Sequence, residues 1–356
     1  MPWGRGRVPP PVAGGTLAVV DSTGEDRRVT RLGLWLTGSW PVVTADGASG
    51  PRSSGHPDRT GPVGVSALDR VADLAGFAEQ AGFDSVWVTD LVPPTTAGRS
   101  GHPDPEAYSL LGALATRTQT VRLGAVPVGE DRRPPSMVGK IVTGIDVISH
   151  GRAVLTYGLG PAGAVRGART IEALRVGRSL LEDESPTFEG TFYSVTDAMN
   201  RPGPVQDGGV PVVVYVERHG DLDGVAVTEF AGLADAVIVG GSADELRRVI
   251  EEVRSAPVPG GPGHDGEVGP LQVIGIGLLP GMTAQSPSSA EPQGGAIVPR
   301  AVASVRDLVD AGVDGCLVPL DMTTPVETLA TIAAGSGDFS LRHVAPGATL
   351  GGDRRR

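Results

Sequence analysis

The feature that most constrains this chain is a regular alternation of short apolar runs with amphipathic segments. Eight runs of strand length begin near Arg31, Asp84, Val121, Arg152, Pro211, Asp235, Leu271 and Val313. Segments with helical character follow them, over residues 66–81, 104–116, 134–149, 169–181, 222–233, 242–255, 298–311 and 325–334. Strands that alternate with helices form parallel sheets. The pattern therefore predicts an α/β protein.

Eight strand–helix units favour a closed (β/α)8 barrel of the TIM type, which takes about 250 residues plus insertions. The alternative is an open doubly wound sheet, which more often has a glycine-rich turn after its first strand. The first apolar run, LWLTGSWPVV, matches that turn poorly. We expect the barrel over residues 30–335, insertion loops at 44–65, 256–269 and 280–295, a small β-hairpin at 188–195, and flexible tails at 1–29 and 336–356.

Residues 134–163 combine a helix, a turn, a strand and a glycine-rich loop. The apolar residues of the helix recur at three- and four-residue spacing, which predicts one buried stripe. This stripe comprises Met137, Ile141, Ile145 and Ile148. His150 and Gly151 would end the helix, with the glycine in a left-handed conformation. The apolar run over residues 152–157 then predicts a buried parallel strand.

Binding sites in such barrels lie at the carboxyl ends of the strands. Tyr157 ends the fourth strand, and Gly158, Gly160 and Gly163 follow it, where backbone N–H groups can hold an anion. Glycine also serves ordinary turns, so both interpretations stand. Gly240 and Gly241 form a second candidate anion site. There, Ser242 and Glu245 have the spacing of a capping box, which favours a plain helix cap.

Two acidic residues end strands at the same rim. Asp90 and Glu130 would serve as general acid or base if burial raised their pKa, and otherwise would be solvated or ion-paired. Pro127 within a buried strand predicts an interruption or a bulge at Val126–Pro127. Trp35 and Trp87 either line a site for a ring-shaped ligand or belong to the core. No histidine or cysteine spacing suggests a metal site.

The net charge of −11 argues against nucleic acid or an anionic membrane as a partner. No apolar run approaches the roughly 20 residues that span a bilayer, and the run TLAVV is too short for a signal-peptide core. The single cysteine, Cys316, has no intrachain partner, which favours a reducing compartment. We therefore expect a cytoplasmic protein.

Four segments occur in an order and spacing that resemble the luciferase-like flavin- or F420-dependent oxidoreductases. They cover residues 80–90 (QAGFDSVWVTD), 105–129, 134–160 and 171–198. The resemblance implies a (β/α)8 barrel, usually homodimeric, that binds FMN or coenzyme F420. It implies hydride transfer, or the use of reduced flavin with oxygen, on a small organic substrate. It also implies a cis peptide under the cofactor ring, which we assign to Val126–Pro127 as cofactor-binding residues.

Two departures from the family pattern keep an alternative open. The loop after Gly160 is short, and an acidic loop with Glu217 and Asp221 follows the fifth strand, where family members have a glycine-rich phosphate loop. Both carboxylates would repel a phosphate, and Arg218 would offset only part of this. The alternative is a degenerate, non-catalytic barrel that acts as a binding or partner subunit. A phosphate-binding enzyme on an unrelated barrel is a third possibility, because fold alone does not decide function.

Overall fold

A computed structural model describes residues 18–20, 26–28, 31–37, 65–90, 105–127, 133–160, 164–206, 209–222, 225–255, 271–277, 297–322 and 324–335. Its main sheet has eight strands in the order β5-β4-β3-β12-β11-β10-β9-β6. Their bounds are Arg31–Thr37 (β3), Ser85–Asp90 (β4), Arg122–Pro127 (β5), Leu155–Gly158 (β6), Val212–Val216 (β9), Ala236–Gly240 (β10), Gln272–Ile276 (β11) and Gly315–Asp321 (β12). All eight predicted strands are therefore present, and every neighbouring pair is parallel.

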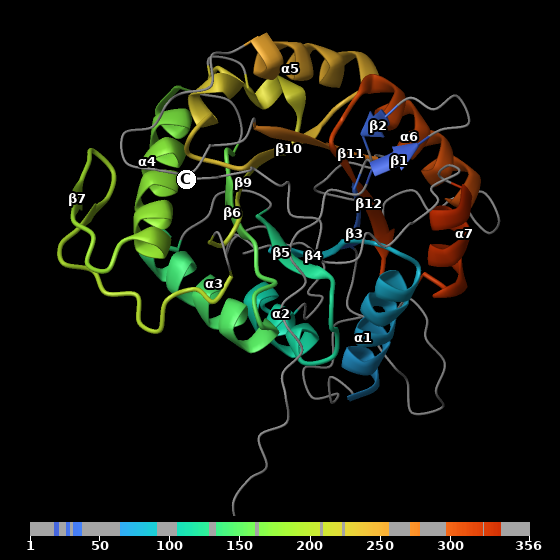
Figure 1. Cartoon of the computed structure of the whole chain (residues 1–356), viewed down its shortest axis with the longest axis horizontal. Helices are drawn as coiled ribbons and strands as arrows, with labels where there is room; N and C mark the ends of the chain where they lie inside the picture. Colours follow the sequence, from blue (N-terminus) through green and yellow to red (C-terminus); the bar gives the residue numbers. More distant parts are fainter. Residues whose placement is uncertain are drawn as a thin grey trace, which may run out of the picture.

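The sheet closes on itself between β5 and β6. The N–H of Leu123 donates to the carbonyl of Arg152 at 2.8 Å, and the N–H of Val154 donates to the carbonyl of Leu123 at 2.9 Å. Leu123 and Ala153 form a parallel bridge. Because the two outer strands are joined, the fold is the predicted (β/α)8 barrel and not an open sheet. Figure 1 shows the strands at the centre with the helices around them.

Seven α-helices of the described residues surround the sheet (Figure 1). Their bounds are Val65–Gln80 (α1), Ala107–Ala115 (α2), Pro135–Ser149 (α3), Ala164–Glu182 (α4), Ala243–Ser255 (α5), Ile297–Ala311 (α6) and Glu327–Gly335 (α7). The helix expected over residues 222–233 was wrong. Two short 3-10 helices replace it, His219–Leu222 (η1) and Val227–Phe230 (η2). The buried residues Val225, Val227 and Phe230 are two and three apart, so they do not form a helical stripe.

The predicted buried face of α3 was half right, because Ile145 is buried and Ile141 packs against the core. Met137 is 53% exposed and Ile148 is 48% exposed, and Val138 and Val142 are buried in their place. A buried carboxylate on the inner face explains this rotation. Asp146 is fully buried and accepts hydrogen bonds from the N–H groups of Ala153 and Val205 and from the side chain of Gln206. The partners of the Asp146 carboxylate lie inside the protein, and these hydrogen bonds therefore determine which face of α3 is buried.

The turn after α3 anchors the barrel through Arg152. Its guanidinium is buried and donates to the Ser149 carbonyl, the Thr118 hydroxyl and the Val121 carbonyl, each at 2.8 Å. These bonds tie the end of α3 to the turn between α2 and β5. The left-handed helix end is confirmed at Gly151, with φ of 85°, and it begins one residue earlier, at His150 with φ of 58°.

Two apolar layers hold the barrel. One lies between the sheet and the helices, and the other fills the interior of the barrel. The inner layer consists of Trp35, Trp87, Val126, Val154, Val213, Tyr215, Ala236, Ile238, Ile276 and Leu317. Trp87 fits there because residue 124 is glycine, where a Cβ would lie 2.3 Å from the indole ring. Trp35 and Trp87 are therefore core residues.

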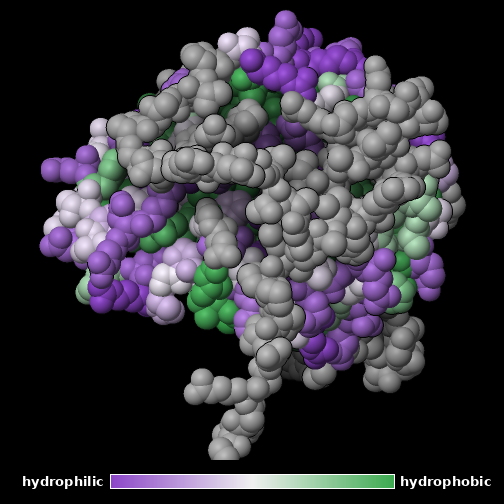
Figure 2. All heavy atoms as spheres, viewed as in Figure 1, coloured by the Kyte–Doolittle hydropathy of each residue, from purple (hydrophilic) through white to green (hydrophobic). Residues whose placement is uncertain are grey.

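The predicted hairpin is confirmed, because Phe188–Glu189 (β7) pairs antiparallel with Ser194–Val195 (β8). Within the expected N-terminal tail, Ala18–Val20 (β1) pairs with Asp26–Arg28 (β2). The rest of that tail, the C-terminal tail and nearly all of the three expected insertion loops lie outside the described residues. None of the described helices has the length and apolarity needed to cross a membrane. In the view of Figure 2, the described surface is mostly hydrophilic with separate hydrophobic patches.

Candidate functional site

A cleft opens beside the carboxyl end of β6, at the rim where barrel sites are found. Four elements meet there: the start of α3, the end of β6, the first half of α4 and the β7–β8 hairpin. The lining residues are Arg133, Pro135, Tyr157, Gly158, Leu159, Gly160, Arg166, Arg169, Thr170, Ala173 and Tyr193. Three of the predicted site residues, Tyr157, Gly158 and Gly160, therefore lie together in one cleft.

The loop from Gly158 to Gly160 has a defined backbone geometry. Gly160 has a φ of 72°, which favours glycine. The N–H of Leu159 donates to the Tyr215 carbonyl at 2.8 Å, and the Thr170 hydroxyl donates to the Gly158 carbonyl at 3.3 Å. A Cβ at Gly158 would lie 3.1 Å from the carbonyl oxygen of Pro127, so the close approach of β5 favours glycine there as well.

Three arginines line the cleft, and two of them, Arg166 and Arg169, give it a positive character, because Arg133 is neutralised by Asp90 and Glu106. Arg166 reaches over the glycine loop, with its Nη1 3.1 Å from where a Cβ of Gly160 would lie. It has no ion pair or hydrogen bond with the residues that the structure describes. Arg169 donates from Nε to the Tyr193 hydroxyl at 2.8 Å and lies 5.5 Å above its ring. Because none of the lining residues is acidic, the cleft suits an anionic group.

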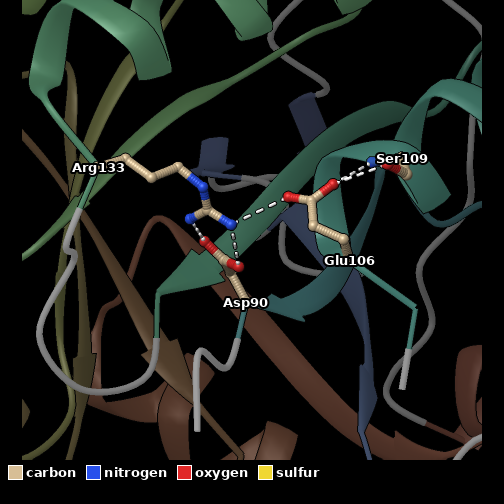
Figure 3. A network of polar contacts seen from close by, with 4 residues as sticks. All are labelled: Asp90, Glu106, Ser109 and Arg133. Carbon is tan, nitrogen blue, oxygen red and sulfur yellow. Dashed lines mark hydrogen bonds and ion pairs between the residues drawn. The ribbon is translucent and has the colours of Figure 1, made fainter. Parts of the chain in front are cut away.

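Arg133, the third of these arginines, holds the predicted acid Asp90 (Figure 3). Its Nη1 lies 2.6 Å from Oδ2 of Asp90, and its Nη2 lies 3.1 Å from Oδ1. Nη2 also donates to Glu106 at 3.0 Å, and Glu106 caps α2 by accepting from the N–H and hydroxyl of Ser109. Asp90 is thus ion-paired in the structure, with both oxygens bound to one guanidinium.

The expected irregularity at Val126–Pro127 was wrong. The register of β5 with β4 runs without a bulge from Arg122 opposite Ser85 to Pro127 opposite Asp90. The cis peptide of the described residues is Arg201–Pro202, so Val126–Pro127 is trans. Pro127 is the last residue of β5, where its missing N–H does not interrupt the ladder. The side chain of Val126 lies in the inner core of the barrel.

Tyr157 lines the cleft from the side of the helices, where its hydroxyl donates to the Pro135 carbonyl at 3.0 Å. The other predicted site residues lie in different places. Gly240 lies where a Cβ would be 2.1 Å from the Glu217 carbonyl oxygen, so the close approach of β9 requires glycine. Gly241 precedes the confirmed capping box. Glu130 and Gly163 lie outside the described residues.

The capping box leaves little room for an anion at the start of α5. The carboxylate of Glu245 accepts from the N–H of Ser242 at 2.7 Å and from its hydroxyl at 2.8 Å. The Ser242 hydroxyl oxygen in turn accepts from the N–H of Glu245 at 3.3 Å. A carboxylate of the protein itself therefore occupies the donors that a bound phosphate would use.

The sequence places Tyr215 at the end of a strand, but it was assigned no role there. Its side chain lies inside the barrel, edge-on to Trp35 with ring centroids 6.3 Å apart. The hydroxyl is buried and has no hydrogen-bond partner among the described residues, and the same is true of the Thr156 hydroxyl on neighbouring β6. Burial, together with the carboxylates of Glu217 and Asp221, raises the pKa of the Tyr215 phenol. A single tyrosine within the valine run of residues 212–216 was the available signal, because a buried tyrosine usually has a partner.

Among the described residues, no group of three or more histidine, cysteine or acidic side chains is arranged to hold a metal ion. The site therefore consists of a glycine loop, arginines and unpaired hydroxyls. These features lie at the carboxyl end of a (β/α)8 barrel, and their chemistry suits an anionic group.

The luciferase-like monooxygenase family matches residues 48–259, and the chain belongs to this family. The F420-dependent glucose-6-phosphate dehydrogenase of Kineococcus radiotolerans is 33% identical over 181 residues, which are 47% of this chain and 51% of the relative. The same enzyme of Intrasporangium calvum is 35% identical over 171 residues, 44% of this chain and 48% of the relative. The chain thus spans about half the length of the curated relatives that it matches.

Solved structures of this fold are similar over more of the chain. An F420-dependent secondary alcohol dehydrogenase, solved with an F420–acetone adduct, is 17% identical with a TM-score of 0.58, and the match covers 87% of this chain and 99% of that one. The EDTA monooxygenase of Chelativorans is 15% identical with a TM-score of 0.56, covering 87% of this chain and 94% of the other. At these identities the likeness shows the fold.

Proposed function

We propose that this chain is an oxidoreductase that binds coenzyme F420 or FMN and transfers a hydride to or from a small organic substrate. The observation that carries the proposal is the guanidinium of Arg166 above the Gly158–Gly160 loop, which has no ion pair or hydrogen bond with any described residue. Both cofactors have an anionic phosphate-bearing tail, and a guanidinium above a glycine loop suits such a group. F420 is the preferred cofactor, because several curated relatives carry F420-dependent names.

The described residues fit such a cofactor in two places. Arg166 and Arg169 would hold the anionic tail at the β6 cleft. The hydroxyls of Tyr215 and Thr156, buried without partners inside the barrel, would hydrogen-bond polar atoms of the cofactor or the substrate. Burial raises the pKa of Tyr215, so its phenol keeps the proton and acts as a donor. The cofactor supplies the hydride chemistry, and the chain supplies binding and orientation.

The test is a titration of the purified protein with F420 and with FMN, followed by cofactor fluorescence. We expect saturable binding of one of them in the micromolar range, and at least a tenfold loss in Arg166→Ala. Arg175→Ala is the matched control, because Arg175 is exposed on the same helix outside the cleft. Binding that is equal in the two variants would contradict the role of the cleft.

A non-catalytic barrel is the second candidate. It is favoured by the ion pair of Asp90 with Arg133, which leaves neither carboxylate oxygen of this predicted acid unbound. If neither cofactor binds at high concentration, this candidate replaces the first. The homodimer and the cytoplasmic location stay predictions, and measurement of the molar mass in solution tests the first of them.

A further inference from the structure

A second cavity, of about 270 Å³, lies at the opposite end of the barrel. It opens among the first residues of the strands, far along each strand from the cleft at β6. Arg31 begins β3, Arg122 begins β5, and Asp84 comes directly before β4, which lies between them in the sheet. The end of α4 also contributes to the wall. No step of the proposed function uses this cavity.

Two of its arginines, Arg31 and Arg122, are held through their backbone, and within the described part of the chain their side chains are not hydrogen-bonded. The backbone N–H of Arg31 donates to the Asp314 carbonyl, and that of Arg122 donates to the Asp84 carbonyl. Neither guanidinium has a hydrogen bond or an ion pair with a described residue. Arg122 is half-buried, and its pKa is lowered by burial and by the positive charge of Arg31, against the opposing carboxylates of Asp84, Asp235 and Asp146. The two cations therefore face the same space and repel each other.

In contrast, the charge of the third arginine of the cavity, Arg178, is neutralised by ion pairs. Arg178 pairs with Glu182 at 2.9 Å and with Asp235 at 3.0 Å, and it donates to the Leu233 carbonyl at 3.0 Å. The carboxylates of Glu182 and Asp235 are therefore already ion-paired with Arg178 on that side of the cavity. Asp84 is the remaining acidic residue of the lining, so two cations face one carboxylate on the other side.

The rest of the wall is apolar. Val154, Val213, Ile274 and Leu317 line it together with Trp87. The indole N–H of Trp87 already donates to the Ser85 hydroxyl at 3.0 Å, so the ring offers an apolar surface. A molecule that fills this cavity thus meets a cationic end and an apolar body.

We propose that this cavity binds a small organic monocarboxylate with a compact apolar body. Its carboxylate would lie between Arg31 and Arg122, because guanidinium groups match carboxylate geometry with paired hydrogen bonds. One negative charge balances the excess of two cations over Asp84. The apolar body would pack against Trp87 and the aliphatic residues of the wall. A binding site with this chemistry lies at the end of the barrel away from the cofactor cleft.

The test uses benzoate as the probe, with titration calorimetry of the full chain. We expect one saturable site for benzoate and at least tenfold weaker binding of benzamide, which has the same shape without the charge. Arg122→Gln should weaken benzoate binding at least tenfold. Arg248→Gln is the matched control, because Arg248 is exposed on α5 and outside the cavity, and it should leave binding unchanged.

Three outcomes would overturn the proposal. Equal binding of benzoate to Arg122→Gln, equal binding of benzamide, or binding of inorganic phosphate but not of benzoate would each contradict the proposed ligand class. Thermal unfolding without ligand gives an independent readout. Arg122→Gln should melt close to the parent, because it loses no hydrogen bond or ion pair with a described residue and its attraction to Asp84 is offset by its repulsion of Arg31. A marked drop would show that the arginine serves the fold instead.

The result is separable from the cofactor proposal. Arg166→Ala should keep full benzoate affinity, since Arg166 lies at the other end of the barrel. A protein that binds neither F420 nor FMN and still binds benzoate would refute the proposed function and support this inference. A protein that binds F420 or FMN but not benzoate would refute this inference and leave the proposed function standing.

Discussion

The Arg133 guanidinium binds both oxygens of the Asp90 carboxylate, at N···O distances of 2.6 and 3.1 Å. Asp90 ends β4, and Arg133 lies just before α3, so the pair joins a strand end to the start of a helix. Arg133 also lies 5.2 Å above the ring of Tyr108 in α2. One side chain therefore organises the rim of the barrel next to the candidate cleft.

Removal of this guanidinium should be costly. The Asp90 side chain is 5% exposed, so Arg133→Ala leaves a buried charge unpaired, and we expect a loss of about 3–5 kcal/mol in the free energy of unfolding. Urea denaturation measures it. Arg247→Ala breaks an exposed pair with Asp244 and should cost less than about 1 kcal/mol. Similar losses in the two variants would contradict the structural role of Arg133.

Two tyrosines give opposite expectations for the same substitution. Tyr215→Phe removes a hydroxyl without a partner, so stability should hold or rise, while cofactor affinity or turnover falls. Tyr157→Phe removes the bond to Pro135 and should cost about 1 kcal/mol of stability. Thermal unfolding and cofactor titration on both variants separate these effects. A clear destabilisation by Tyr215→Phe would show that its hydroxyl has a structural partner.

The carboxyl of Asp84 should make stability depend on pH. Burial raises its pKa from 3.8 to about 6, against the opposing charges of Arg31 and Arg122. The folded state therefore binds this proton more tightly than the unfolded state. The resulting stabilisation is fully present below about pH 4 and is lost as the pH rises through about 6, by roughly 2–3 kcal/mol in all.

Comparison with Asp84→Asn isolates this carboxyl. The difference in unfolding free energy between the parent and Asp84→Asn should change over that pH range, whereas the difference for the exposed Asp73→Asn should stay flat. Urea denaturation at several pH values measures both. A flat difference for Asp84→Asn would mean that its pKa is the same in the folded and unfolded states.

The inner core should not accept a methyl group at Gly124. Its Cβ would lie 2.3 Å from the ring of Trp87, so we expect Gly124→Ala to destabilise by about 1–3 kcal/mol or more. Gly112→Ala in α2 meets open space and should stabilise by about 0.5–1 kcal/mol. A combination of Gly124→Ala with Trp87→Leu should restore part of the loss if the clash is its cause.

The alternation of apolar and amphipathic runs was sufficient to predict the barrel and all eight of its strands, because strand and helix periodicities are local properties of the chain. The hairpin at 188–195 and the cap at Ser242 were predicted for the same reason. The failures occurred where distant partners decide the outcome. The hydrogen bonds of Asp146 with residues 153, 205 and 206 determine which face of α3 is buried. The spacing of residues within the helix does not show these bonds.

In the candidate site, too, local patterns could be predicted and contacts between distant residues could not. The sequence by itself determined the family pattern, the glycine loop at the end of β6 and the candidate residues along the rim. Only the tertiary structure decided that Asp90 is bound by Arg133. It also decided that, within the described part of the chain, Arg166 is unpaired above Gly160 and the Tyr215 hydroxyl has no partner. The reason is physical. The availability of a charge or a hydroxyl depends on which groups the closed barrel brings within hydrogen-bond distance, and those groups are far apart along the chain.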